Sequence, residues 1–236
     1  MPVFYTSQID QNQAILGEEE SRHIVKVLRM AGGDTLEMVD GKGNYYSGTI
    51  TAADPKACRV TINNVTKEFL RRDYYLHIAM APPKSTERFE WFLEKATEIG
   101  VDEITPVICA RSERNRIRHE RSQKILIAAM KQSGRALLPG LNREVSLNDF
   151  LSRSTADIKL IAHCNTTGDQ RIMAAPHKDQ SWIIMIGPEG DFTSGEIEAA
   201  IQNAYREINL GEAIYRTETA GIMACHMISL LYQNKS

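Results

Sequence analysis

The sequence predicts an α/β protein in which helices cover both faces of a parallel sheet, preceded by a small β-rich domain. Two observations lead to this prediction. From about residue 74, short apolar runs typical of buried strands alternate with segments of helical periodicity. Before about residue 72, short strands are separated by glycines and by Asp54-Pro55, a pattern typical of a small barrel or sandwich.

The expected N-terminal domain spans residues 1–72. A short helix is predicted over residues 18–30, immediately before Gly32 and Gly33. Strands are predicted after it at residues 34–41, 44–54 and 58–68. The first of these ends at a turn signal, and the other two alternate between apolar and polar residues.

The expected second domain spans residues 73–236. Apolar residues recur with helical spacing from Phe89 to Ala96, and Gly100 is placed to end that helix, which is predicted at residues 87–100. The other helices are predicted at residues 121–134, 194–204 and 217–233. The strands are predicted at residues 74–80, 103–109, 157–164, 181–187 and 206–211.

Composition narrows the class of protein. The chain has 236 residues and a net charge of −2, so any contact with nucleic acid is expected to come from a local basic patch. No apolar run approaches the ~18 residues of a membrane span, and the N-terminus lacks a signal-peptide pattern, so a cytoplasmic location without membrane contact is expected. The four cysteines form no CxxC pair and no HExxH occurs, which favours reduced thiols and no metal.

Two glycine-ended strands carry the functional signal. The run "IIMIGPEGDFTSGE" ends a strand at Gly187-Pro188-Glu189-Gly190, and Thr193 to Glu196 form a capping box that starts a helix. A second strand ends in "NLGEAIYRTETAG" and restarts as a helix at Thr217. Each loop alone could be a well-made turn, but two on consecutive strands favour a ligand site at the carboxyl ends of the sheet.

The chemistry of these loops limits the ligand. Neither loop contains the glycine and lysine pattern of a phosphate-binding loop, and both contain acids, Glu189 and Glu218. A nucleoside triphosphate is therefore disfavoured. A ligand with an adenine edge and a cationic centre, such as S-adenosylmethionine, fits better.

The two loops together, "IGPEGDFTSGEI" and "LGEAIYRTETA", closely resemble the SPOUT methyltransferases, and more narrowly the RsmE-type family that methylates N3 of one uridine in 16S ribosomal RNA. "PPKSTERFEWFLEKATEIGVDEITPVICARS" (82–112) and "KQSGRALLP" (131–139) resemble two further regions of that family. "HIVKVLRMAGGDTLEMVDGKG" (23–43) resembles its N-terminal PUA-like β-barrel. The resemblance covers nearly the whole chain.

The resemblance implies an RNA-binding PUA-like barrel at residues 1–72 and a SPOUT domain at 73–236, whose parallel sheet contains a trefoil knot built from the two loops. It also implies a homodimer in which two subunits complete each site. Asp191 and Ala213 depart from the family, which often has glycine and arginine at these positions. The implied contacts with S-adenosylmethionine are His163, Ile186, Gly187, Pro188, Glu189, Gly190, Leu210, Gly211, Ile214, Thr217 and Ala220.

Residues 111–124 form the densest basic stretch of the chain, with six Arg or Lys against two Glu. This stretch is either a solvated face or, as the resemblance favours, a contact with the RNA backbone. Trp91 lies on a predicted helix and belongs either to the core or to a dimer interface. The candidate substrate contacts are Arg29, Lys84, Arg111, Arg114, Arg116, Arg118 and Arg135.

The predicted activity is methylation of N3 of a uridine in 16S ribosomal RNA, with free RNA or the assembled 30S subunit as substrate. The N3 proton must leave, so a carboxylate or a cationic donor is needed, and Arg216 and Glu218 are the candidates. The spacing of residues does not identify the proton acceptor. The alternatives are another SPOUT enzyme acting on a ribose 2′-OH or on transfer RNA, and a non-catalytic RNA-binding module.

Overall fold

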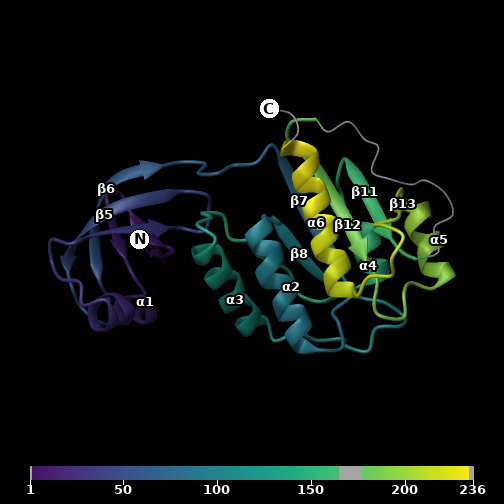
Figure 1. Ribbon diagram of the computed structural model, residues 1–236, viewed down its shortest axis with the longest axis horizontal. Coiled ribbons are helices and arrows are strands. Elements are labelled where there is room, and N and C mark those ends of the chain that lie inside the picture. The colour runs from purple at the N-terminus through teal and green to yellow at the C-terminus, as the bar shows by residue number, and fades with distance from the viewer. Residues whose placement is uncertain (1, 165–176, 234–236) are drawn as a thin grey trace. The chain divides into compact units, whose positions relative to one another are not determined.

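The computed structural model describes residues 2–164 and 177–233. The chain forms two compact units (Figure 1). One contains Met1–Arg71 together with Ile127–Leu138, and the other contains Arg72–Leu126 together with Pro139–Ser236. The expected boundary near residue 72 therefore does not account for residues 127–138, which pack with the first unit.

The first unit is built on a curled six-stranded sheet with the order β1-β4-β5-β6-β3-β2 (Figure 1). Its pairs are antiparallel except for β1 with β4. The strands are β1 Val3–Tyr5, β2 Gln8–Asp10, β3 Gln13–Ile15, β4 Thr35–Val39, β5 Tyr45–Ala52 and β6 Arg59–Thr66. The first three were not predicted, because strands of three residues are too short to show a period.

The predicted helix at residues 18–30 is divided into two types of helix. The α-helix α1 covers Glu18–Arg22, and the π-helix η1 continues over His23–Val27. Ile24 is buried in the unit's core, whereas Val27 is 67% exposed. Arg29 follows in a left-handed conformation with φ 57°, which explains why the helix does not reach Met30.

Residues 127–138 join the first unit through buried apolar side chains. Met130 and Ala136 pack with Val39 in one cluster. Two backbone hydrogen bonds reinforce this packing, from Gly43 N to the carbonyl of Ala136 and from Leu138 N to the carbonyl of Gly41. The helix α3 (His119–Gln132) is therefore divided between the two units, with Leu126 in the second unit and Ile127 in the first.

The second unit contains a parallel sheet with the order β10-β8-β7-β12-β11-β13, and β9 pairs with β8 beside this path. The strands are β7 Tyr74–Met80, β8 Glu103–Ile108, β9 Gly140–Leu141, β10 Val145–Ser146, β11 Ile158–Ala162, β12 Gln180–Ile186 and β13 Arg206–Ile208. The helices are α2 Thr86–Ile99, α3 His119–Gln132, which continues into the first unit, α4 Leu147–Arg153, α5 Ser194–Gln202 and α6 Thr217–Gln233.

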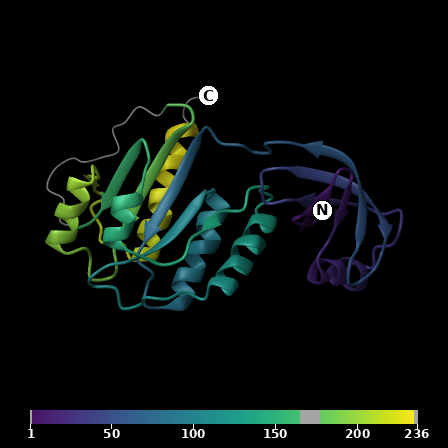
Figure 2. The same cartoon turned by 180° about the vertical axis from the view of Figure 1, so that it is seen from behind.

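Helices cover both faces of this sheet, as the continuous apolar strands predicted (Figure 2). Helices α4 and α5 pack on one face, in a cluster that includes Phe150 and Met185. Helix α6 packs on the other face beside α2, where a Cβ on Gly221 would lie 2.3 Å from Met80 and 2.7 Å from Phe92. Only glycine allows this close contact between helices and sheet.

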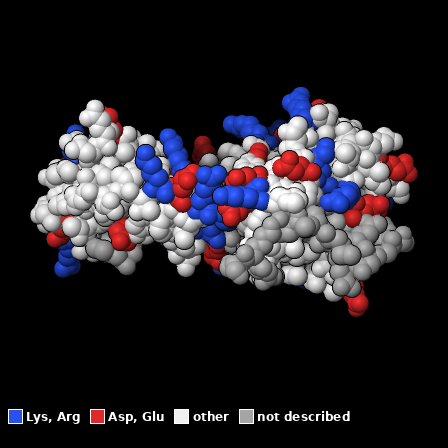
Figure 3. All heavy atoms as spheres, turned by 90° about the horizontal axis from the view of Figure 1, so that it is seen from above, with Lys and Arg blue, Asp and Glu red and all other residues white. Residues whose placement is uncertain are grey.

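Charges of both signs are interspersed on the surface that Figure 3 shows, so Lys and Arg do not form one uniformly basic face there. In the parts of the chain that the structure describes, no helix is long and apolar enough to cross a membrane.

Candidate functional site

The carboxyl ends of three neighbouring strands meet at one edge of the parallel sheet. Strand β11 pairs with both β12 and β13, so that Ala162 is in register with Ile186 on one side and with Ile208 on the other. The segments that follow β12 and β13 therefore start side by side. We call residues 187–193 the first loop and residues 209–216 the second loop.

The two loops enclose a cavity of about 300 Å³ together with the end of β11. Ten of the eleven residues implied as cofactor contacts line this cavity, and Gly190 does not. Asn209, Glu212 and Tyr215 also line it, and no sequence pattern singled them out as cofactor contacts. The ten residues are His163, Ile186, Gly187, Pro188, Glu189, Leu210, Gly211, Ile214, Thr217 and Ala220.

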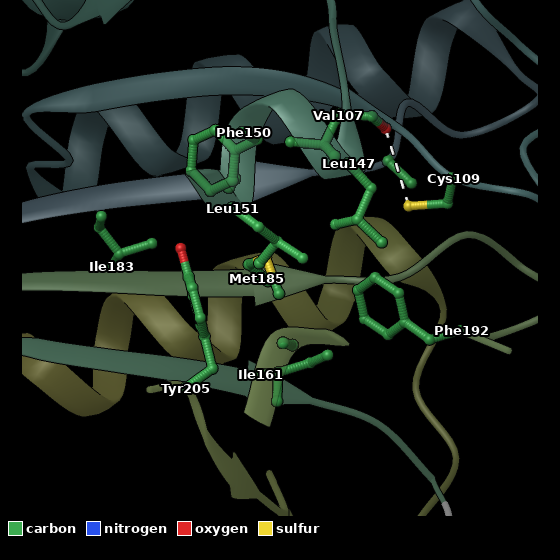
Figure 4. Packing of buried hydrophobic residues seen from close by; sticks show 13 residues of the cluster. Val107, Cys109, Leu147, Phe150, Leu151, Ile161, Ile183, Met185, Phe192 and Tyr205 are labelled. Carbon is green, nitrogen blue, oxygen red and sulfur yellow. Dashed lines mark hydrogen bonds between the residues drawn. The ribbon is translucent and has the colours of Figure 1, made fainter. Parts of the chain in front are cut away.

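The first loop is held by contacts from several directions. Phe192 packs into the buried cluster on the α4 and α5 face of the sheet (Figure 4). Thr217 Oγ1 at the start of α6 donates a hydrogen bond of 3.1 Å to the carbonyl of Gly187. A Cβ on Gly187 would lie 3.0 Å from the Phe192 ring. Gly187 is therefore required because the backbone of the first loop passes close to the Phe192 ring.

Asp191, where the resemblance implied a glycine, occupies a conformation that favours glycine. Its φ is 60°, in the left-handed region that Asp tolerates better than most residues. Its carboxylate accepts hydrogen bonds from the backbone N–H of Phe192 at 2.8 Å and of Cys164 at 3.0 Å. These bonds compensate for the strained backbone and tie the first loop to the end of β11.

The predicted capping box at the end of the first loop is confirmed. Thr193 Oγ1 accepts a hydrogen bond from Glu196 N, and the Glu196 carboxylate accepts one from Thr193 N. The same carboxylate accepts a hydrogen bond of 2.7 Å from Ala110 N, in the segment after β8. Glu196 therefore connects the helix start to a loop from another strand.

The second loop has fewer contacts with the rest of the protein than the first loop has. Its glycine, Gly211, has φ 145°, and a Cβ there would lie 2.9 Å from the Tyr215 hydroxyl. Gly211 N donates to Asn209 Oδ1 within the loop at 2.8 Å. Among the described residues, no side chain from another segment forms a hydrogen bond or ion pair with residues 210–216. Ile214 is 85% exposed although it is large and apolar.

The electrostatics of the cavity favour a cationic ligand. Among the described residues that line it, three carry carboxylates, Glu189, Asp191 and Glu212, whereas Arg216 carries the one guanidinium. The lining also includes His163, whose Nε2 lies 2.9 Å from Glu207 Oε1. Within the described part of the chain, His163 Nδ1 is buried without a hydrogen-bond partner. Such a group is available to a ligand in the cavity.

The structure does not bring the two candidate catalytic residues together. Arg216 lines the cavity, whereas Glu218 lies in a different hollow of about 280 Å³ with Arg88 and Trp91. Glu218 is 6% exposed, and its Oε1 lies 3.6 Å from Arg88 Nε. Its Oε2 is buried and has no hydrogen-bond partner among the residues that the structure describes. Trp91 is 44% exposed, which rules out a place in the core of the chain.

The basic stretch divides into arginines that contact the protein and arginines that face solvent. Arg111 Nη1 donates to the carbonyl of Gly190 at 2.7 Å. Arg114 donates to the carbonyls of Pro83 and Lys84. No sequence pattern predicted these bonds. Arg116 and Arg118 are exposed and make no ion pair or side-chain hydrogen bond with the described residues. Arg29 and Arg135 belong to the first unit.

A second polar cluster lies in the interior of the parallel sheet, away from the two loops. His77 on β7 is 7% exposed, and its Nε2 lies 2.7 Å from Thr105 Oγ1 on β8. Burial lowers the pKa of His77, although the Glu103 carboxylate 3.6 Å from Nδ1 acts in the opposite direction. Over residues 2–164 and 177–233, no three His, Cys, Asp or Glu side chains are grouped as metal ligands.

Comparison with known proteins agrees with this architecture. Residues 71–229 match the model of the RNA methyltransferase domain, and residues 16–63 match that of the RNA methyltransferase PUA domain. The ribosomal RNA small subunit methyltransferase E of Buchnera aphidicola is 28% identical over 98% of this chain and 93% of its own length.

Two solved structures extend the comparison. A probable rRNA-methyltransferase from Porphyromonas gingivalis is 38% identical, with a TM-score of 0.92 and complete coverage of both chains. The ribosomal RNA small subunit methyltransferase E of Neisseria gonorrhoeae, solved with S-adenosyl methionine bound, is 26% identical, with a TM-score of 0.87 over 98% of each chain. The chain therefore belongs to the RNA methyltransferase family and to its RsmE type, as the motifs of its two loops indicated.

Proposed function

We propose that this protein transfers a methyl group from S-adenosylmethionine to N3 of a uridine in 16S ribosomal RNA. The observation that supports this most directly is the cavity between the two loops at the carboxyl ends of β11, β12 and β13. Ligands of parallel α/β sheets bind at this edge. The relatives from Buchnera and Neisseria are small-subunit ribosomal RNA methyltransferases, and the latter was solved with the cofactor.

The residues of the cavity fit this cofactor. Leu210, Ile186 and Ala162 provide apolar surface for a flat adenine ring. The three carboxylates of the lining complement a sulfonium cation. His163 Nδ1, buried and unpartnered within the described residues, provides a polar contact that a nucleoside can satisfy. None of the described lining residues is a lysine, which argues against a triphosphate.

The residues of this chain contribute to the reaction by positioning the two reactants and by stabilising the charge that develops on uracil. S-adenosylmethionine, when bound, supplies a methyl group on a positively charged sulfur. The two loops hold that group and the uracil ring in line, and such positioning accounts for much of the rate of a displacement. Arg216, a cation of the cavity, is proposed to stabilise the negative charge that develops on uracil as the N3 proton leaves.

Glu218 is proposed to act at a dimer interface and not within the cavity of its own subunit. Glu218, whose Oε2 has no hydrogen-bond partner among the described residues, and the exposed Trp91 line a hollow that a second copy of the chain can complete. Exposure of Ile214 also supports a second subunit at the mouth of the cavity. Light scattering should report about twice 26.5 kDa. A fully active monomer would contradict this proposal.

The first unit is proposed to bind the RNA, either free 16S ribosomal RNA or the assembled 30S subunit in the cytoplasm. The match of residues 16–63 to the PUA domain supports this role. The two loops are proposed to be the crossing segments of a trefoil knot, which the bond between Thr217 and Gly187 supports.

Nucleoside mass spectrometry of ribosomal RNA from a strain without the protein tests the activity. Loss of 3-methyluridine from 16S RNA, restored by the wild-type gene, is the expected result. Loss of a ribose methyl group or of a transfer RNA modification would assign a different substrate. An unchanged nucleoside profile would contradict the proposed activity.

A further inference from the structure

The segment after β8, residues 109–118, contacts the first loop and its surroundings at several points, and we call it the basic loop. Arg111 Nη1 donates to the carbonyl of Gly190 at 2.7 Å. The stem of the same side chain lies against Gly190, so that a Cβ there would be 3.3 Å from Arg111 Cδ. A side chain at residue 190 would therefore press on Arg111, so the two residues are closely packed.

Arg114 acts on the first loop through one intermediate residue. Its Nε lies 3.1 Å from the carbonyl of Lys84, and its Nη2 lies 2.5 Å from the same oxygen. Lys84 N in turn donates a hydrogen bond of 2.9 Å to Glu189 Oε1. The carbonyl of Lys84 thus accepts hydrogen bonds from the basic loop, and the backbone N–H of Lys84 donates a hydrogen bond to the first loop.

Further contacts fix the basic loop itself. Ala110 N donates to Glu196 at the start of α5, and Glu113 forms an ion pair of 2.7 Å with Lys84. Cys109 N donates to Ser112 Oγ at 3.0 Å. The ends of β7, β8 and β12 are thereby joined into one hydrogen-bonded assembly around Glu189.

From this geometry we propose that Arg111 and Arg114 are positioning residues, which hold the first loop and its Glu189 in the shape that binds the cofactor. The proposal rests on the proposed cofactor site. It separates these two arginines from Arg116 and Arg118, which face solvent in the same loop and can bind phosphate. Neighbouring arginines of one basic stretch thus have two different functions.

Four single variants of the full-length protein test this division: Arg111→Gln, Arg114→Gln, Arg114→Lys and, as the matched control, Arg116→Gln. The first measurement is hydrogen exchange in the protein without ligand. Arg111→Gln and Arg114→Gln should speed exchange at Lys84 and at residues 187–193, whereas Arg116→Gln should leave both unchanged. The second measurement is the affinity for S-adenosylmethionine by calorimetry.

Arg114→Gln should weaken cofactor binding by about tenfold, the loss expected for one charge-assisted hydrogen bond. Arg114→Lys should restore part of the affinity, because an ammonium keeps the charge but not the two-nitrogen geometry of the guanidinium. Arg116→Gln should instead flatten the salt dependence of binding to 16S RNA by roughly one unit. Glu189→Gln combined with Arg114→Gln should weaken binding by less than the product of the single effects.

Three results would overturn the proposal. The first is a wild-type rate of hydrogen exchange in both Arg111→Gln and Arg114→Gln, and the second is that these variants change only the salt dependence of RNA binding. The third is that Arg114→Gln and Glu189→Gln reduce the cofactor affinity additively. If Arg114→Gln does not fold, Arg111→Gln decides the matter by the same measurements. If the wild-type protein binds no S-adenosylmethionine, the proposed function fails, and the exchange rates still decide whether the arginines position the loop.

Discussion

The two loops of the cavity begin side by side and contrast in how they are held. The first loop is tied to β11 by Asp191, to α6 by Thr217 and to the basic loop by Gly190, and Phe192 anchors it in the core. The second loop has an internal bond at Asn209 and a large apolar side chain in solvent. The first loop forms a side of the cavity that is already ordered without ligand. The second loop forms a side that we expect a ligand or a second subunit to order.

This contrast indicates that the two loops contribute differently to the binding of the cofactor. A loop that is already ordered loses little conformational entropy when the ligand arrives, whereas ordering the second loop reduces the affinity that its contacts provide. Specificity for the cofactor is therefore expected to come from the first loop. The rates of entry and release are expected to come from the second.

The largest expected effect comes from changing the shape of the first loop. Gly187→Ala places a methyl group 3.0 Å from the Phe192 ring. Overpacking of this kind costs about 1–3 kcal/mol, so the affinity for S-adenosylmethionine should fall by roughly fivefold to 150-fold if the strain is felt in the binding conformation. Gly195→Ala is the matched control, because nothing lies within 4 Å of its new methyl group. Equal affinities of the two variants for S-adenosylmethionine, measured by calorimetry, would contradict the conclusion that the shape of the first loop determines cofactor binding.

A smaller effect should appear when the cofactor orders the second loop. Saturating S-adenosylmethionine should slow hydrogen exchange at residues 209–216 more than at residues 187–193, because the first loop is already held by its neighbours. Exchange followed by mass spectrometry with and without the cofactor measures this difference. Equal protection of both loops would show that the first loop is also ordered by the ligand.

Removing the exposed arginines should leave both loops unchanged. Arg116→Gln and Arg118→Gln together should reduce the slope of log affinity against log salt for 16S RNA by roughly two, one for each phosphate that is no longer neutralised. Filter binding at several salt concentrations provides the slope. Cofactor affinity should stay at the wild-type value, and a decrease in it would extend the positioning role to the whole basic loop.

The smallest effect concerns His77, which lies away from both loops. Burial lowers its pKa in the folded protein below the ordinary value of about 6.5, so the unfolded chain binds more protons as the pH falls. Its contribution to stability is complete above pH 6.5 and is lost as the pH falls through the folded pKa. His77→Asn should weaken the dependence of melting temperature on pH in this range.

The longer strands and helices of the parallel sheet could be predicted from the sequence because they are periodic, whereas the two-residue strands β9 and β10 and the short helix α4 could not. The cavity could also be placed, since glycines and a capping box at Thr193 mark the ends of strands. The bonds of Arg111 and Arg114 could not be predicted, because they join distant segments through backbone carbonyls that carry no sequence signal. The separation of Arg216 and Glu218 into two hollows could not be predicted either. Residues two apart near the start of a helix do not face each other, and the spacing alone does not show which surface each one lines.

The packing of residues 127–138 with the first unit affects how the chain folds during synthesis. The core around Val39 lacks Met130 and Ala136 until residue 138 has left the ribosome. At roughly 5–20 residues per second, several seconds pass between the last strand of the curled sheet and this segment. The part of the first unit before residue 72 is therefore expected to remain partly exposed until this later segment has been made. Nascent chains cut before residue 138 should be more sensitive to protease than those cut after it.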